Sequence, residues 1–328
     1  MTGVALGEFA LIDRYFRDRG AQRADVLLGV GDDGALLRLP PGEDLVAVSD
    51  TLVDGVHFPS GSDPRSVGHR ALAVNLSDIA AMGGTPRWAL LSLTLPSVDE
   101  AWLEAFAAGF GDLALGHGVA LVGGDTTRGP LTIGVQVLGS VPAGQGLRRS
   151  GARAGDALFV SGTPGDAAAG LASLMGRSEG TDHRTGTNHR TGTDAPTDAA
   201  AFEARFLFPT PRVALGQALL PLASACIDVS DGLVGDLGKL AAASGCAAVL
   251  DVDALPSTAP RHCVLHGGDD YELLFTVPPA RVAAVAALPG VTRIGEMRAG
   301  DGVTLRESGR ETAAASVAGP AGYDHFAR

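Results

Sequence analysis

Apolar residues recur along this 328-residue chain with two periods, one typical of helices and the other typical of strands. Helical spacing predicts helices at residues 8–17, 64–82, 99–115, 165–175, 212–222, 233–243 and 281–287. Short apolar runs predict strands at residues 26–30, 35–39, 45–48, 89–95, 119–122, 132–138, 157–160, 225–229, 248–252, 272–277 and 291–294. Because strands alternate with helices in both halves, we expect two α/β domains, at residues 1–150 and 151–328.

One stretch, residues 176–200, interrupts this pattern. It contains a polar duplication, in which residues 187–192 repeat most of residues 181–186. A segment with so little to bury cannot offset the entropy lost on ordering, so we expect a disordered insertion. Its histidines, His183 and His189, leave metal binding open as a less favoured interpretation.

Aspartates stand beside glycine, serine or threonine at several separated points, most of them where an apolar strand is expected to end. These sites contain Asp32 and Asp33, Ser49 and Asp50, Asp125, Asp228 and Asp231, and Asp269 and Asp270. For any single site an ordinary turn is the favoured interpretation, since Asp beside Gly is a common turn signal. Together they indicate a ligand site, because α/β sheets bind ligands at the carboxyl ends of their strands.

Asp78 adds a further carboxylate near the end of the helix expected at residues 64–82. An acidic side chain is unfavourable near a helix C-terminus, so its presence suggests a compensating cation.

The charge balance limits the kinds of ligand and partner that this chain can bind. The net charge is −12 and the only lysine is Lys239. Polyphosphate must be neutralised by basic side chains or by divalent cations held on carboxylates, and this composition favours Mg²⁺ on oxygen ligands. The same balance argues against a nucleic-acid or membrane partner. Three cysteines without CxxC spacing, and no signal-peptide pattern, favour a reduced cytoplasmic location.

Two apparent phosphate-binding motifs fail on their context. The GxGxxG pattern at Gly29, Gly31 and Gly34 is not followed by a predicted helix that could receive a pyrophosphate. Lys239 lacks the upstream glycine spacing and the following Ser or Thr of a Walker loop. Nucleotide binding here therefore requires another architecture.

Taken in order, the acidic motifs resemble those of thiamine-monophosphate kinases, in the aminoimidazole ribonucleotide synthetase-like superfamily. The resemblance runs from residues 7–9 to residues 322–326, nearly the whole chain apart from 176–200. It implies two α/β domains whose mixed sheets carry packed helices, and a homodimer formed through the first domain. It also implies phosphorylation of thiamine monophosphate to the diphosphate, with ATP as co-substrate.

The resemblance implies roles for particular residues. Several Mg²⁺ ions would be held by Asp33, Ser49, Asp50, Asp78, Asp125, Asp228 and Asp231. The nucleotide would contact Gly124, Asp125, Arg149 and Ser230, and thiamine phosphate would face His57, Asp269 and Tyr323. The family usually has glutamate at position 269, so the shorter aspartate is expected to reach its ligand through water.

No residue stands out as a general base, and the proposed acceptor needs none. A phosphate monoester has a second pKa of about 6 and is already anionic at neutral pH. We expect direct in-line transfer, with Mg²⁺ positioning the two anions. The alternative is a nucleotide- or metal-binding regulatory subunit without turnover, which Mg²⁺-dependent ADP formation would exclude.

Overall fold

The computed structural model describes residues 7–179 and 196–314, and these fall into two compact units. The first unit contains Met1–Gly146 and Val213–Gln217; the second contains Leu147–Arg212 and Ala218–Arg328. The division after Gly146 lies close to the one expected at residue 150. Tyr323, His183, His189 and the duplicated segment lie outside the described residues.

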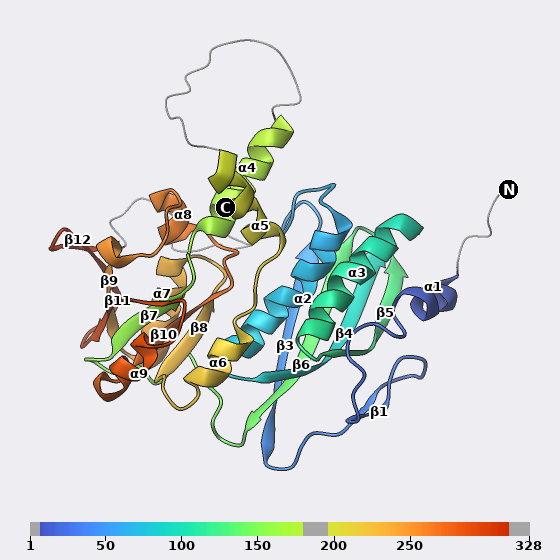
Figure 1. Ribbon diagram of the computed structural model, residues 1–328, viewed down its shortest axis with the longest axis horizontal. Helices are drawn as coiled ribbons and strands as arrows, with labels where there is room; N and C mark the ends of the chain where they lie inside the picture. Colours follow the sequence, from blue (N-terminus) through green and yellow to red (C-terminus); the bar gives the residue numbers. More distant parts are fainter. Residues whose placement is uncertain (1–6, 180–195, 315–328) are drawn as a thin grey trace, which may run out of the picture. The chain divides into compact units, whose positions relative to one another are not determined.

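The first unit is built on a four-stranded sheet with the order β3-β6-β4-β5 (Figure 1). Its strands are β3 (Glu43–Val53), β4 (Thr85–Leu95), β5 (Ala120–Arg128) and β6 (Thr132–Pro142). Only β4 and β5 run parallel, and helix α3 (Glu100–Gly116) joins them. The remaining elements are α1 (Glu8–Tyr15), β1 (Val26–Leu28), β2 (Leu36–Leu37), α2 (Pro64–Ala81) and most of α6 (Val213–Leu219).

Helices α2 and α3 pack closely together because glycines face the contact. A Cβ atom on Gly68 of α2 would lie 2.1 Å from the Phe106 carbonyl oxygen, and one on Gly109 of α3 would lie 1.9 Å from that of Arg65. The start of α2 is set by Asp63, whose side chain accepts a hydrogen bond from the Ser66 amide, and by Pro64 at the first helical position.

The two faces of the first sheet differ in burial. Ile133, Val135 and Val137 point to the buried face, while Ser49 and Thr51 point to the opposite face and are exposed. The hairpin β1–β2 covers part of this second face, where Leu37 and neighbouring apolar residues pack on Trp88, Ala120 and Val122. The rest of that face stays open.

The second unit contains a mixed seven-stranded sheet with the order β13-β12-β9-β11-β7-β10-β8. These strands are β7 (Ala157–Ser161), β8 (Ala225–Val229), β9 (Ala247–Asp251), β10 (Glu272–Val277), β11 (Val291–Arg298), β12 (Val303–Glu307) and β13 (Arg310–Ala313). Its helices are α4 (Asp166–Glu179), α5 (Pro196–Leu207), α7 (Leu233–Ser244), α8 (Arg261–His266) and α9 (Val282–Ala286). Mixed sheets with helices packed on them confirm the predicted fold class.

Part of the expected insertion is helical. Helix α4 continues through residues 176–179, and α5 already begins at Pro196, so the prediction of disorder over 176–200 is wrong at both ends. The two helices stabilise each other: the Ser173 hydroxyl donates to Glu203 at 2.6 Å, and Gly170 lies against the Phe202 carbonyl. The sequence analysis missed α5 because this helix begins inside the stretch assigned to the insertion.

Strands β3 and β5 are longer than expected, which changes the setting of two acidic motifs. Ser49 and Asp50 lie inside β3, and Asp125 lies inside β5, so the expectation that these motifs follow a strand end is wrong. Strand β3 continues because its backbone stays paired with β6 along this length, and β5 continues because it stays paired with β4. Among the residues described, no helix has the length and apolar content needed to span a membrane.

Candidate functional site

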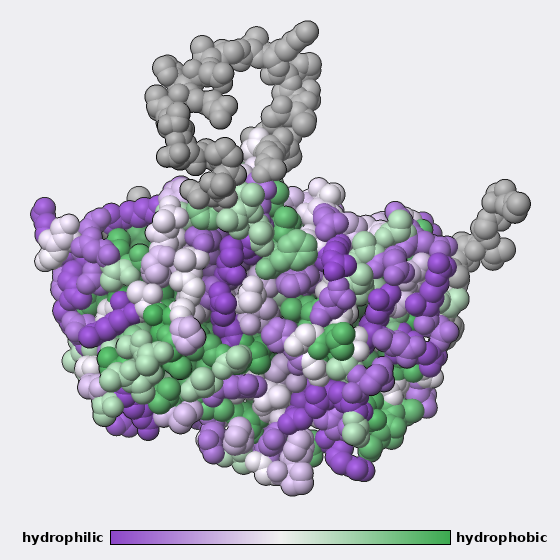
Figure 2. Space-filling model, viewed as in Figure 1, coloured by the Kyte–Doolittle hydropathy of each residue, from purple (hydrophilic) through white to green (hydrophobic). Residues whose placement is uncertain are grey.

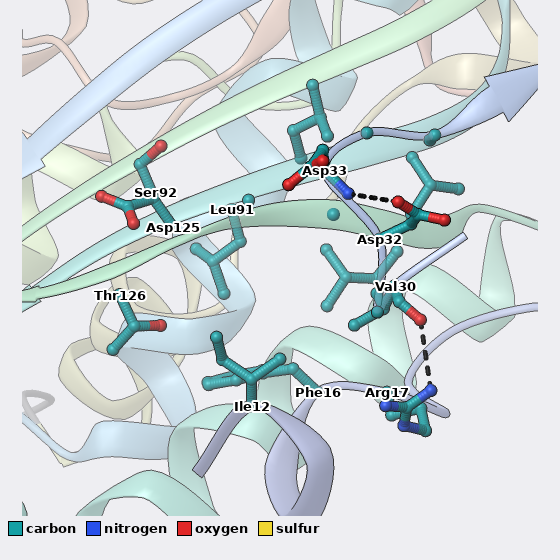
Figure 3. A pocket seen from close by; sticks show the side chains of 18 of the residues that line it. Ile12, Phe16, Arg17, Val30, Asp32, Asp33, Leu91, Ser92, Asp125 and Thr126 are labelled. Atoms are coloured by element: carbon teal, nitrogen blue, oxygen red, sulfur yellow. Dashed lines mark hydrogen bonds between the residues drawn. The ribbon is translucent and has the colours of Figure 1, made fainter. Parts of the chain in front are cut away.

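The first unit contains a pocket of about 1090 Å³ on the open face of its sheet (Figure 3). The apolar part of its wall includes Ile12, Phe16, Leu90, Leu121 and Leu138. The polar part contains four aspartates, Asp13, Asp32, Asp33 and Asp125, together with Arg17, Ser92, Thr126 and Gln136. The pocket thus contains two of the predicted metal ligands, Asp33 and Asp125, and the predicted nucleotide contact Gly124.

A β-bulge determines that Asp125 faces this pocket. Trp88 pairs with Ala120, but after the bulge Leu90 pairs with Gly123 and Ser92 with Asp125. The extra residue in β5 shifts the alternation of side chains by one position. Asp125 therefore lies beside Ser92 on the open face, as Figure 3 shows.

Besides the predicted nucleotide contact, the backbone at position 124 itself requires glycine. Its φ is +147°, and a Cβ atom there would lie 1.8 Å from the Leu91 carbonyl oxygen. Strand β4 therefore approaches β5 too closely for any other residue.

The other predicted metal ligands of the first unit are distributed over both faces of the sheet. Ser49 is exposed on the open face, where it accepts a 3.4 Å hydrogen bond from Gln136. Asp50, the next residue in β3, points to the opposite face because side chains alternate along a strand. That is the face on which α2 packs against β3, and half-buried Asp78 lies near the end of α2.

His57 lies in a tight turn after β3. Its Nδ1 atom accepts a 2.9 Å hydrogen bond from the Val53 amide, and its own amide donates to the Val53 carbonyl. The Nδ1 atom is thus the unprotonated nitrogen of the neutral ring, which leaves Nε2 as the N–H donor. The ring is half-buried, and its role toward thiamine phosphate stays a prediction.

In the second unit, two predicted loops meet at one end of the sheet. Residues 230–232 follow β8 and residues 267–271 precede β10, and these two strands pair with Val229 opposite Glu272. The Asp269 amide donates to the Ser230 carbonyl at 2.9 Å. A Cβ atom on Gly268 would lie 2.3 Å from the same oxygen, so glycine permits this approach.

A buried carboxylate that the sequence interpretation missed holds the first of these loops. Asp236, in the first turn of α7, accepts hydrogen bonds from the Ser230 amide at 3.0 Å and the Asp231 amide at 2.9 Å. It also accepts a 2.8 Å bond from Lys239, whose ammonium contacts the Asp231 carboxylate as well. Burial, the largest effect, raises the pKa of Asp236, and Lys239 acts in the opposite direction.

The signal for this network was present in the sequence. An aspartate in the first turn of a helix, three residues before a lysine, is typical of a side chain that binds loop amides and pairs with the lysine. Lys239 was considered only as part of a failed Walker motif. Asp228 is buried inside β8, whereas Ser230 and Asp231 remain partly accessible.

The second loop is conformationally strained. Asp269 and Tyr271 adopt φ values of +69° and +53°, in the left-handed region that non-glycine residues rarely occupy. Between them, Asp270 buries its carboxyl group and accepts bonds from the Gly165 amide at 2.6 Å and the Ala167 amide at 3.2 Å. Burial raises the pKa of Asp270 well above its usual range. Strain that is held in this way is typical of functional sites.

Hydrogen bonds in the second unit hold two of the predicted ligand contacts, Asp269 and Arg149. The Tyr271 hydroxyl donates to the Asp269 carboxylate at 3.1 Å, so it helps to orient a predicted substrate contact. Arg149 is exposed, and its backbone carbonyl accepts a 3.0 Å bond from the Ser244 hydroxyl at the end of α7.

The donor set suits a hard cation. The predicted ligands offer carboxylate and hydroxyl oxygens, which Mg²⁺ prefers. Within the described residues, however, no group of three His, Cys, Asp or Glu side chains is placed to hold a metal ion. Asp33, Ser49, Asp50, Asp78 and Asp125 belong to the first unit, and Asp228 and Asp231 to the second. The complete ligand set therefore stays a prediction.

Comparison with known proteins identifies the family. The models of the AIR synthase related protein match in two parts, the N-terminal domain over residues 31–141 and the C-terminal domain over residues 153–307. Thiamine-monophosphate kinase of Salmonella typhimurium is 46% identical over 340 residues, which cover 99% of this chain and of the relative.

Solved structures agree. The crystal structure of thiamine-monophosphate kinase from Stenotrophomonas maltophilia K279a is 46% identical, with a TM-score of 0.79, over 92% of this chain and 97% of that one. The structure of AaThiL complexed with AMPPCP and TMP is 31% identical, with a TM-score of 0.74, over 99% of this chain and 100% of that one. The chain thus belongs to the thiamine-monophosphate kinase family, as the order of its acidic motifs predicted.

Proposed function

We propose that this kinase transfers the γ-phosphoryl group of ATP directly to thiamine monophosphate, with Mg²⁺ held on the aspartates of both units. The observation that carries the proposal is the Ser92–Asp125 pair in the acidic pocket, together with the fixed Ser230–Asp231 loop. Each of the two supplies oxygen atoms of the kind that Mg²⁺ takes as ligands while it also binds phosphates.

The residues have separate tasks in this proposal. Asp33, Ser49, Asp50, Asp78, Asp125, Asp228 and Asp231 would hold Mg²⁺, which supplies charge neutralisation for phosphates. Gly124, Asp125, Arg149 and Ser230 would bind the nucleotide, while His57, Asp269 and Tyr323 would bind the acceptor. The Asp236 carboxylate keeps the Ser230 and Asp231 amides in place. The structure of AaThiL with AMPPCP and TMP supports the choice of both substrates.

The acceptor phosphate needs little activation, since its oxygen is anionic at neutral pH. The chain's contribution is then to position two anions in line and to offset their repulsion.

A homodimer formed through the first unit completes the proposal. Leu27, Leu36 and Leu45 are 51%, 59% and 53% exposed in this unit. Figure 2 shows apolar surface over β1, bordered by polar surface. Apolar patches of this kind are typical of interfaces.

The cysteines Cys226, Cys246 and Cys263 are buried and form no disulfide, which supports the proposed cytoplasmic location.

The deciding experiment measures ADP release with ATP and Mg²⁺ across thiamine monophosphate, thiamine and unrelated phosphate monoesters. We expect ADP release that depends on thiamine monophosphate and yields thiamine diphosphate. Stimulation by another acceptor alone would refute the substrate assignment. ATP with an isotopically chiral γ-phosphoryl group tests direct transfer: we expect inversion, whereas retention would show a phosphoenzyme.

A further inference from the structure

The single lysine of this chain is placed on one of the predicted metal ligands. Lys239 lies on α7, and its ammonium contacts the carboxylates of Asp231 and Asp236. The other fixed-charge basic side chains of the chain are arginines, so this position is chemically distinct. An ammonium is a compact point charge with rotatable donors, and it resembles a small cation more closely than a planar guanidinium does.

The two carboxylates that bind Lys239 differ in accessibility. The Asp236 side chain is 1% exposed and already accepts the Ser230 and Asp231 amides, so it is fixed. The Asp231 side chain is 31% exposed, so a cation from solvent can reach its carboxylate. Lys239 therefore has one buried anchor and one contact that an incoming cation could replace.

A counterion at this position has a physical reason. Asp231 and Asp236 come from adjacent segments and share Lys239 between them, so their negative charges lie close together. Without a cation between them, the two carboxylates repel each other. The ammonium removes this cost when no metal is bound.

We propose that Lys239 is the resident counterion of Asp231 in the metal-free enzyme and leaves Asp231, while staying on Asp236, when a divalent cation binds. The inference rests on the proposed metal role of Asp231. It makes Lys239 a positioning residue that sets the affinity for Mg²⁺, because every binding event must replace one ion pair by another.

Because the chain has a single lysine, the proposal can be tested with one spectroscopic signal. Protein labelled with ¹³C-lysine gives one Cε resonance, which is followed while MgCl₂ is added to the nucleotide-free enzyme. NaCl at equal ionic strength is the control. We expect the resonance to move saturably, with the midpoint that calorimetry gives for Mg²⁺ binding.

An unmoved lysine signal while calorimetry shows the site filling, or an equal shift with NaCl, would overturn the inference. So would the absence of saturable Mg²⁺ binding by both methods. These results leave the kinase assay free to succeed, whereas normal ADP release by Asp231→Asn would instead refute the metal role of Asp231.

Two variants provide an independent measurement. Lys239→Met keeps the length of the side chain but removes its charge, and Lys239→Arg keeps the charge. We expect Lys239→Met to bind Mg²⁺ about two- to fivefold more tightly in calorimetry, the factor that a partly exposed ion pair represents. Its melting temperature in EDTA should fall, while Lys239→Arg should change both less. Equal or weaker Mg²⁺ binding by Lys239→Met would contradict the proposal.

Discussion

Asp125 in the first unit and Asp231 in the second are both predicted Mg²⁺ ligands, but their surroundings differ. Asp125 lies inside strand β5 beside Ser92, and none of the described side chains forms an ion pair with it. Asp231 lies in a loop whose amides donate to Asp236, and its own carboxylate binds Lys239. The paired strands fix the first position, and a charged side-chain network fixes the second.

These surroundings show two ways in which an acidic site can stay folded without its cations. In the first unit, β5 holds Asp125 through backbone hydrogen bonds that do not depend on charge. In the second unit, the loop depends on an internal cation. Removing the carboxylate charge should therefore lower the stability of the second region and leave that of the first unchanged, while it harms catalysis in both.

The largest effect should come from Asp125→Asn and Asp231→Asn. Each should lower turnover by about 10²-fold or more, the loss typical of a removed electrostatic stabiliser. In EDTA, Asp231→Asn should lower the melting temperature because Lys239 loses a partner, whereas Asp125→Asn should not. The readouts are steady-state ADP release and thermal unfolding.

Asp301→Asn, in the exposed turn before β12, is the control and should change neither quantity. Near-normal turnover in both site variants would refute the metal-site proposal. Equal melting temperatures in EDTA would remove the distinction between the two regions.

The next effect concerns pH and the buried carboxyl group of Asp270. Burial raises its pKa in the folded state, so its contribution to stability is complete below the unfolded pKa of about 3.9 and is lost as pH rises through the folded value. Acidification from neutral pH toward the unfolded value should therefore strengthen the second unit locally. Hydrogen exchange of the Gly165 and Ala167 amides, corrected for intrinsic rates, measures this.

The first unit should respond with the opposite sign. A hydrogen bond from Arg23 is the main effect that lowers the pKa of Asp25. The contribution of Asp25 to stability is therefore present above the unfolded pKa and is lost as pH falls through the folded value.

The variant Asp270→Asn should flatten the response of the second unit to pH. Identical pH dependence in the variant and the parent would contradict the assignment to Asp270.

A smaller effect is expected from Tyr271→Phe. Loss of its hydrogen bond to Asp269 should raise the KM for thiamine monophosphate by about two- to tenfold, because such bonds contribute about 0.5–1.5 kcal/mol. The kcat should change little. Tyr15→Phe, which removes a 3.4 Å bond to Glu100 in the first unit, is the matched control. A fall in kcat with unchanged KM would argue against a substrate-positioning role.

The smallest effect should follow deletion of residues 181–192. This duplicated segment is polar and offers little to a core, so turnover and melting temperature should stay close to those of the full chain. The deletion leaves α4 and α5 intact, including the bond between Ser173 and Glu203. A large loss of either quantity would show that the segment contributes to folding or catalysis.

Much of the fold was readable from local patterns. Short apolar runs located strands such as β8 and β10 at their observed bounds, because these strands are buried along their whole length. Capping signals located the start of α2, at Asp63 and Pro64. By contrast, β12, β13 and α8 were missed because they are short, and α5 was missed because it begins inside the stretch assigned to the insertion.

The family, the acidic character of the site and the candidate residues could all be read from the amino-acid sequence, because glycine and aspartate constrain the backbone and the ligand type locally. Which of these residues meet depends on the folded chain. The bulge in β5 directs Asp125 toward Ser92, and the pairing of β8 with β10 brings Ser230 to Asp269. Such contacts depend on strand register and packing between segments distant in the chain, which no local pattern encodes.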